Sequence, residues 1–191
     1  MNELFQRIEQ EIPRLRRYAR ALTRDHSSAD DLVQDCLTRA LGKGHLWREG
    51  TDLRAWLFTI LHNQHVNRVR RSVREGVAVS ASDADPGLVA LASQFSRIEL
   101  RDLARGLAQL PEEQRQVVLL VGLEGLRYET VAEIMDVPVG TVRSRLSRGR
   151  EALRQMMNGE AERARERCHA EAASRPRRAA SVAKDPARAS A

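Results

Sequence analysis

Hydrophobic residues recur at helical spacing along most of the chain, and the most informative stretch is residues 126–154. Ile134 and Met135 lie three and four residues after Val131, which predicts a short amphipathic helix. An Asp-Val-Pro sequence at 136–138 interrupts this pattern. Proline fits only the first turn of a helix, because it has no backbone N–H to donate. The stretch therefore predicts two helices joined by a tight turn, with the second beginning near this proline.

The second of these helices has two faces of different character. On a helical wheel its buried stripe contains Val142, Leu146, Gly149 and Leu153. The opposite face contains Gly140, Ser144, Ser147, Arg148 and Glu151. Arginines border that face, with Arg143 and Arg150 on one edge and Arg145 on the other. Small central residues let a helix approach base edges in a DNA groove, while bordering arginines reach the phosphates. The pattern predicts a helix-turn-helix; the alternative is a helix pair with a solvated basic face.

Two more helices are predicted near the N-terminus, over residues 2–23 and 29–41, and Ser27 or Ser28 can cap the second. The helix over 29–41 buries the stripe Ala29, Leu32, Val33, Cys36, Leu37 and Ala40. It exposes Asp30, Asp31, Gln34, Asp35 and Thr38. Acidic residues near a helix N-terminus interact favourably with the helix dipole, which explains Asp30 and Asp31 without any partner.

A further strong helix is predicted over residues 53–71. Its buried stripe is Leu53, Trp56, Leu57, Ile60 and Leu61. Phe58 is expected on the opposite face, with Arg54, His62 and His65. An aromatic ring exposed among basic and polar residues can stack on unpaired bases. Arg68, Arg70 and Arg71 at the end of this helix form a candidate phosphate-contact patch.

The remaining segments divide the chain. Residues 72–94 are rich in Ala, Ser, Asp, Gly and Val without an amphipathic period, so they predict a flexible linker. Helices over 95–110 and 111–123 then precede the helix-turn-helix. We therefore predict an all-α fold with a helical domain over 1–71 and a second over 95–157. We expect a basic tail over 158–191 to prolong the last helix to about residue 172 and to be disordered beyond residue 174.

Composition restricts the class of protein. The 191 residues carry a formal net charge of +6, which favours an anionic partner. No apolar run is long enough for a membrane span, and the N-terminus lacks the apolar segment of a signal peptide. Two distant cysteines and a pair of histidines, His62 and His65, do not complete a metal-ligand set. We expect a cytoplasmic protein without metal, cofactor or catalytic residues of its own.

The quoted motifs also carry a family resemblance. The sequence VPVGTVRSRLSRGREALR, together with the preceding LPEEQRQVVLLVGLEGLRYETVAEIM, resembles region 4 of extracytoplasmic-function sigma factors, the small promoter-specificity subunits of bacterial RNA polymerase. ADDLVQDCLTRAL resembles their region 2.2, and LRAWLFTILHN is most similar to the alphaproteobacterial general-stress type. Arg127 stands where that family often has a Ser or Thr helix cap. The resemblance covers roughly residues 10–157, so it excludes the tail.

The resemblance implies partners and site residues. Core RNA polymerase would be bound through its β′ coiled coil and β flap, with the β′ contact made by Asp31, Gln34 and Asp35. Duplex minus-35 DNA would be read by Thr141, Arg143, Ser144, Arg145, Ser147 and Arg148. Single-stranded minus-10 DNA would be captured by Arg39, Trp47, Phe58, Thr59, Asn63, Arg68, Arg70 and Arg71. An anti-sigma factor and a role in a stress response are also implied.

Two other functions fit part of the sequence. A stand-alone helix-turn-helix repressor or activator would explain residues 126–154, but it leaves the acidic helix of the first domain without a role and normally requires a dimer. A sigma mimic that titrates an anti-sigma protein would explain the overall resemblance. The arginines of the second helix in the helix-turn-helix argue against such a mimic, because it would not need to bind DNA.

Overall fold

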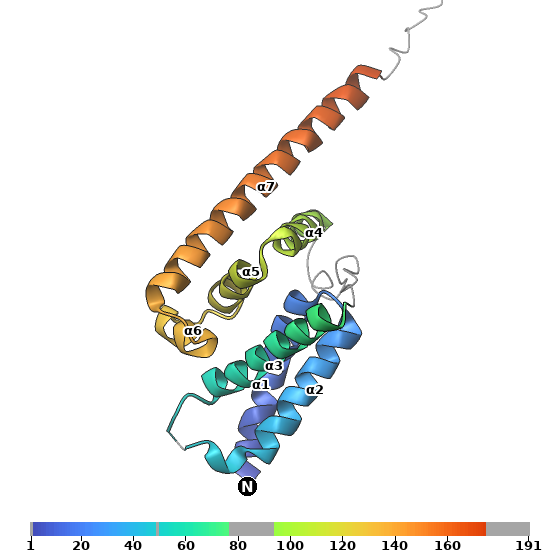
Figure 1. Cartoon of the computed structure of the whole chain (residues 1–191). Helices are drawn as coiled ribbons and strands as arrows, with labels where there is room; N and C mark the ends of the chain where they lie inside the picture. The colour runs from blue at the N-terminus through green and yellow to red at the C-terminus, as the bar shows by residue number, and fades with distance from the viewer. Residues whose placement is uncertain (1, 49, 77–93, 175–191) are drawn as a thin grey trace, which may run out of the picture. The chain divides into compact units, whose positions relative to one another are not determined.

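The computed structural model describes residues 2–48, 50–76 and 94–174, and the regular secondary structure within these ranges is helical (Figure 1). Side chains are described within these ranges except at residues 2, 94–99 and 160–174. The elements are α1 (Asn2–Thr23), α2 (His26–Gly42), the 3₁₀-helix η1 (Gly44–Leu46), α3 (Leu53–Glu75), α4 (Gln94–Gln109), α5 (Glu112–Val118), the π-helix η3 (Leu119–Leu123), α6 (Tyr128–Met135) and α7 (Val139–Ser174). The predicted all-α class is confirmed. Most of the predicted linker lies outside the described residues.

The chain forms two compact units, residues 1–157 and residues 158–191. The first unit contains α1 to α6 and the beginning of α7, so both predicted helical domains belong to it. The predicted helix 53–71 is longer than expected, because α3 continues to Glu75 and ends at Gly76 in a left-handed conformation with φ 65°. In the second unit α7 extends to Ser174, close to the predicted end of the tail helix.

Helices α1, α2 and α3 pack around one apolar core. Leu15 and Tyr18 of α1, Leu32 and Cys36 of α2, and Leu57 of α3 are all fully buried there. Helix α2 begins earlier than predicted because Asp25, rather than Ser27 or Ser28, caps it. The Asp25 carboxylate accepts a 2.7 Å hydrogen bond from the Ser28 backbone N–H. Asp31 and Asp35 of α2 are exposed, as the sequence predicts, while Asp30 is half-buried.

The prediction that Phe58 is an exposed stacking ring is wrong. Phe58 has no exposed surface, and its ring meets that of Tyr18 edge-on, with 5.3 Å between centroids. The buried stripe of α3 is rotated by roughly 70° from the predicted one, towards Phe58 and His65. The predicted core residue Trp56 consequently lies at the edge of the stripe and is only half-buried.

The helix-turn-helix is formed by α6 and α7, and its predicted turn is confirmed. Asp136 adopts the left-handed conformation with φ 52°, and the Val137 N–H donates to the Ala132 carbonyl at 3.0 Å. Pro138 immediately precedes α7. The predicted stripe is also confirmed, since Val142, Leu146, Gly149 and Leu153 are all buried. Arg127 precedes α6 without a side-chain capping bond, in agreement with the sequence.

Gly149 lets α7 approach α5 closely. A Cβ atom at this position would lie 2.7 Å from a Val118 side-chain carbon and 3.5 Å from the Gln114 Cβ. We expect Gly149→Ala to destabilise the protein by about 1–3 kcal/mol, because overpacking outweighs the better helix propensity of alanine. Urea unfolding followed by circular dichroism measures this cost. Gly140→Ala is the matched control, since a Cβ there meets no atom within 4 Å, and equal stability losses in both variants would contradict the close packing.

Candidate nucleic-acid interface

The first turns of α7 present the predicted recognition face. Arg143, Ser144, Ser147 and Arg148 are exposed, and Thr141 is half-buried. The Ser144 hydroxyl donates to the Thr141 carbonyl at 3.0 Å, which keeps this short side chain close to the helix. Gly140 is also exposed on α7. The face therefore combines short side chains with arginines that project beyond them, a shape that fits a DNA groove.

Arg145 differs from the other arginines of α7. Its guanidinium lies 2.6 Å from the Glu113 carboxylate of α5, and only 21% of its side chain is exposed. The sequence pattern placed Arg145 at the edge of the exposed face but could not show this acidic neighbour. A DNA phosphate at this edge would have to compete with Glu113 for the guanidinium.

The candidate minus-10 residues of α3 lie on two different faces. Thr59 is half-buried, with its hydroxyl bonded to the Ala55 carbonyl at 2.9 Å, and Asn63 is exposed. Trp56 precedes them by three and seven residues and therefore shares their face. Phe58 belongs to the core instead. Sequence reasoning missed Trp56 as a candidate because it assigned this ring to the buried stripe.

Trp47, in the loop after η1, packs against the edge of the core and is half-buried. The guanidinium of Arg7 lies 4.9 Å from the centre of its ring, in a cation–π arrangement. Its indole nitrogen is buried and lacks a hydrogen-bond partner among the described residues. One ring face is therefore taken up by an arginine of the same chain.

The basic candidates of the first domain also differ in their surroundings. Arg39 and Arg70 are exposed. Arg71 forms an i, i+4 ion pair with Glu75 at 2.7 Å. Arg68 lies 2.7 Å from the Asp35 carboxylate of α2, so one candidate DNA contact is bonded to one candidate polymerase contact.

The predicted acidic surface of α2 is present. Asp31, Gln34 and Asp35 are all exposed and lie on one face of the helix, because they are spaced by three and four residues. Asp35 is bonded to Arg68, while Asp30 is half-buried and lies 3.1 Å from the ring of His26. Asp31 is thus the acidic member of the docking set whose substitution leaves these ion pairs intact.

His62 and His65 are buried rather than exposed. The His65 ring nitrogen lies 2.6 Å from the Glu112 carboxylate of α5, which also binds Arg115 and Gln116. Burial, reinforced by the charges of Arg115 and Arg68, lowers the pKa of His65 to about 4. Burial beside His65 likewise lowers the pKa of His62 to about 4. Within the described residues, no three His, Cys, Asp or Glu side chains are placed to bind a metal ion.

These two histidines predict a pH dependence of stability. Their pKa values are lower in the folded chain than the ordinary 6.5, so the unfolded chain binds more protons between pH 6.5 and 4. The free energy of unfolding should fall through this window, by roughly 1–3 kcal/mol for the two histidines together, because the Glu112 carboxylate 2.6 Å from His65 favours its protonated ring and limits the fall. Thermal melts of His65→Gln should show a weaker decline than those of the exposed-residue control His45→Gln. Parallel pH profiles for these two variants would contradict the assignment.

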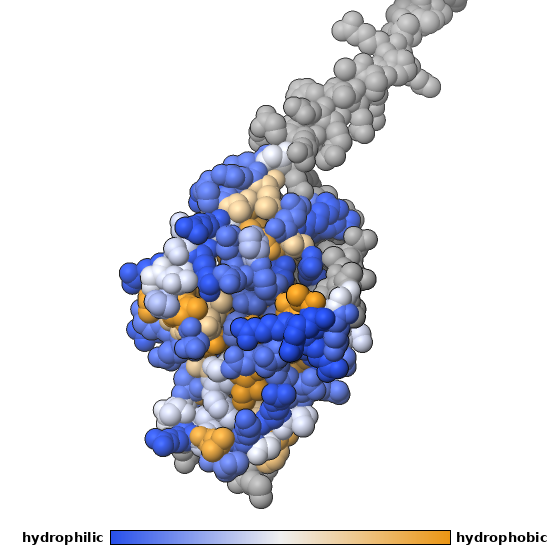
Figure 2. Space-filling model, viewed as in Figure 1, coloured by the Kyte–Doolittle hydropathy of each residue, from blue (hydrophilic) through white to orange (hydrophobic). Residues whose placement is uncertain are grey.

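The visible face of the molecule is mostly hydrophilic and shows only small, separate hydrophobic areas (Figure 2). Among the described helices, none combines the length and apolarity needed to cross a membrane. Charged surfaces are thus the candidate binding sites. They are the basic surfaces of α3 and α7 and the acidic face of α2.

Comparison with known proteins shows the family of this chain. The family model for the Sigma2 domain of PhyR matches residues 8–62, and the model for Sigma-70, region 4 matches residues 100–153. The ECF RNA polymerase sigma factor EcfG of Rhodopseudomonas palustris is 38% identical over 142 residues, which cover 74% of this chain and 78% of that protein. This chain belongs to the ECF sigma factor family. The ECF sigma-E factor of Escherichia coli is 34% identical over 137 residues, covering 64% of this chain and 70% of that protein.

Solved structures agree with this membership. The sigma factor RpoE of Bartonella quintana, crystallised with the anti-sigma factor NepR, superimposes with a TM-score of 0.74 at 34% identity. The match covers 83% of this chain and 98% of that one. CnrH, solved with the cytosolic domain of CnrY, shares the fold with a TM-score of 0.60 at 23% identity. As an ECF sigma factor, this chain acts in promoter-specific initiation of transcription.

Proposed function

We propose that this sigma factor reads the minus-35 element with the exposed face of α7 and captures the minus-10 element with α3 and the loop before it. The observation that carries the proposal is the recognition face of α7. Its short side chains and projecting arginines lie opposite a buried stripe that holds the helix against its own domain. Thr141, Ser144, Ser147 and Arg148 contact base edges or nearby phosphates, and Arg143 contacts the backbone.

For the minus-10 element, the stacking ring is Trp56 rather than Phe58. Trp56 is half-buried on the face that also carries Thr59 and Asn63, so it can offer part of its ring to an unpaired base. Trp47, in the loop before α3, also contacts the melted strand, and its phosphates are neutralised by Arg39, Arg68, Arg70 and Arg71. Asp31, Gln34 and Asp35 dock on basic residues of the polymerase β′ coiled coil, and the second domain contacts the β flap.

In this proposal the polymerase carries out the phosphodiester chemistry, so the sigma factor itself is not an enzyme. The sigma factor acts in the cytoplasm, where the polymerase is. The similarity to EcfG of R. palustris, and to an RpoE solved with the anti-sigma factor NepR, supports control by an anti-sigma protein in a stress response. An anti-sigma partner of this kind would hold the chain away from polymerase until the stress signal arrives.

The deciding experiment is run-off transcription with core polymerase on a library of randomised promoters. A sigma factor directs initiation from templates that share two elements about 17 base pairs apart. A stand-alone helix-turn-helix regulator would bind duplex DNA but initiate nothing, and a sigma mimic would bind an anti-sigma protein without supporting transcription. Absence of promoter-dependent transcripts, with polymerase active on a control sigma factor, would reject the proposal.

Substitutions of Arg148 and Arg143 on α7 should have different effects on base specificity and on general DNA affinity. Arg148 is exposed near the centre of the recognition face, so Arg148→Ala should relax base preference in the minus-35 element by about 1–3 kcal/mol. Arg143→Ala, at the edge, should weaken binding to all sequences alike and reduce the salt dependence. Selection on randomised minus-35 DNA measures both effects. Unchanged base preference in Arg148→Ala would contradict its central position.

A further inference from the structure

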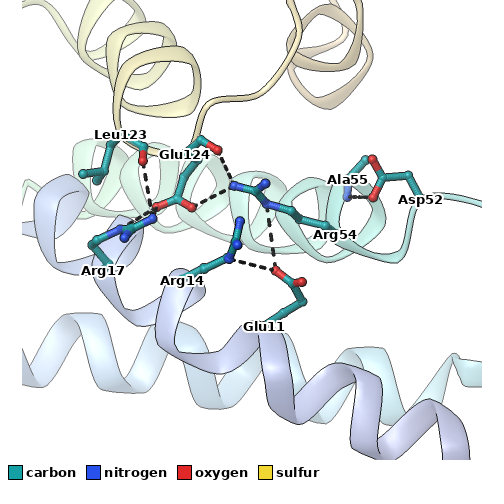
Figure 3. A network of polar contacts seen from close by, with 8 residues as sticks. All are labelled: Glu11, Arg14, Arg17, Asp52, Arg54, Ala55, Leu123 and Glu124. Carbon is teal, nitrogen blue, oxygen red and sulfur yellow. Dashed lines mark hydrogen bonds and ion pairs between the residues drawn. The ribbon is translucent and has the colours of Figure 1, made fainter.

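A buried carboxylate joins the two sigma domains inside the first unit. Glu124, in the turn between η3 and α6, belongs to the second domain, and its side chain has no exposed surface. Its carboxylate lies 2.9 Å from Arg17 of α1 and 3.1 Å from Arg54 of α3, both in the first domain (Figure 3). Arg54 also donates to the Glu124 backbone carbonyl, and Arg17 donates to that of Leu123.

The backbone around Glu124 is shaped for this contact. The Glu124 N–H donates to the Leu119 carbonyl at 3.1 Å in a π-helical bond, a geometry that often occurs at functional sites. Gly125 follows with φ 65°, a left-handed conformation that favours glycine. The turn therefore directs both the side chain and the carbonyl of Glu124 towards the first domain.

Additional polar contacts connect the same two domains. Glu112 of α5 meets His65 of α3 at 2.6 Å, and Arg24 after α1 donates to the Ala108 carbonyl of α4 at 3.5 Å. Helix α3 also packs against α6. The contact between the domains thus has several parts, with Glu124 as the member whose charge is completely buried.

This arrangement is incompatible with simultaneous contact to both promoter elements. Asn63 and Arg70, which face minus-10 DNA in the proposed function, line the same groove of about 630 Å³ as Arg145 of α7. Elements about 17 base pairs apart are separated by roughly 58 Å along B-DNA. Residues lining one groove cannot span that distance, so the domains must separate before the promoter is bound.

We propose that the free sigma factor is self-closed, with Glu124 clasped between Arg17 and Arg54, and that opening this clasp is a step in forming the holoenzyme. This inference rests on the proposed function for its biological meaning, but the clasp itself is a property of the free chain. We name Glu124, Arg17 and Arg54 the interdomain clasp.

The chemistry of the clasp suits a contact that must open. Buried ion pairs contribute little net stability, because hydration of the separated charges offsets most of their attraction. Arg54 also keeps a neighbour in the first domain after opening, since its guanidinium lies 3.9 Å from the Glu11 carboxylate (Figure 3). Arg17 is already 44% exposed. Both arginines of the clasp can therefore be solvated or paired again when the domains separate.

The distance between the domains in the free chain tests this proposal. Fluorescent labels are attached to cysteines introduced at the exposed positions Glu9 of α1 and Gln155 of α7, with Cys168→Ser to remove a second site. Cys36 needs no replacement, because burial raises the pKa of its thiol to about 12. Single-molecule energy transfer is then compared for the unchanged clasp, for Glu124→Lys, and for Glu133→Lys as an exposed control on α6.

We expect high transfer with the unchanged clasp and with Glu133→Lys, and a low-transfer population enriched at least tenfold in Glu124→Lys. Arg17→Glu with Arg54→Glu should open the chain in the same way, and adding Glu124→Arg to that pair should restore closure. Low transfer with the unchanged clasp would overturn the proposal, as would high transfer in a Glu124→Lys chain that circular dichroism shows to be folded. If Glu124→Lys does not fold, the proposal is tested by the double variant Arg17→Glu with Arg54→Glu and by the triple variant that adds Glu124→Arg.

Binding to core polymerase separates this inference from the proposed function. If closure hides the binding-competent state, a tenfold larger open population should tighten the apparent Kd for core enzyme by up to tenfold in Glu124→Lys. A chain that opens on Glu124→Lys but never binds polymerase would overturn the proposed function and leave the clasp standing. A chain that binds and transcribes, with the same energy transfer in every variant, would overturn the clasp alone.

Discussion

Phe58→Ala is expected to destabilise the first domain by about 3–5 kcal/mol. The Phe58 ring is completely buried, it meets the equally buried Tyr18 ring edge-on at 5.3 Å, and the Arg54 guanidinium lies 5.7 Å from its centre. Removing the ring leaves a cavity between α1 and α3 that these neighbours cannot fill without moving. A loss of this size is a large part of the stability of a typical domain.

Chemical unfolding of the free protein measures this loss, and Val73→Ala is the matched control. Val73 lies on the same helix but is 75% exposed, so its truncation should change stability by less than about 0.5 kcal/mol. Trp56→Ala adds a functional comparison, because it should cost less stability than Phe58→Ala and should reduce promoter opening, seen as permanganate reactivity of thymines. A Phe58→Ala protein that is as stable as Val73→Ala would refute the core assignment.

Phe58 also illustrates the limit of sequence reasoning for this fold. The positions of the helices follow from local spacing, and the turn at residues 136–138 follows from proline chemistry, so both could be predicted. The direction of a buried stripe is harder to infer when a helix is covered on more than one side. Helix α3 packs against α1 and α2 and also against α6, so polar residues such as His65 are buried along with apolar ones.

The same limit applies to the candidate sites, where features of one helix could be predicted and contacts between helices could not. Exposure of the recognition face on α7 and of the acidic residues on α2 could be predicted, because each depends on the period of one helix. Ion pairs between helices could not, because they join residues far apart in sequence. Arg145 with Glu113 and Asp35 with Arg68 are examples, and each pair alters what its members can offer to DNA or polymerase. Glu124 had no recognisable signal, since nothing in its local sequence indicates burial.

The second large expected effect concerns the acidic face of α2. We expect Asp31→Arg to weaken assembly with core polymerase by roughly 10²-fold or more. A positive charge would then face the basic residues of the β′ coiled coil, and like charges in an interface cost several kcal/mol. Asp31 is preferable to Asp35 for this test. Substitution of Asp35 would also break its 2.7 Å ion pair with Arg68. A loss of polymerase binding could then not be distinguished from a loss of stability or of DNA contact.

Fluorescence anisotropy of labelled sigma factor titrated with core enzyme measures the affinity, beside a thermal melt of the free protein. Glu9→Arg is the matched control, because it makes the same charge change at an exposed site on α1. The control should bind core enzyme normally and melt like the unaltered chain. Asp31→Arg should also melt normally, since its side chain is exposed, and should lose binding in a way that high salt partly restores by screening the repulsion. Equal affinity of the two variants would remove α2 as the docking helix.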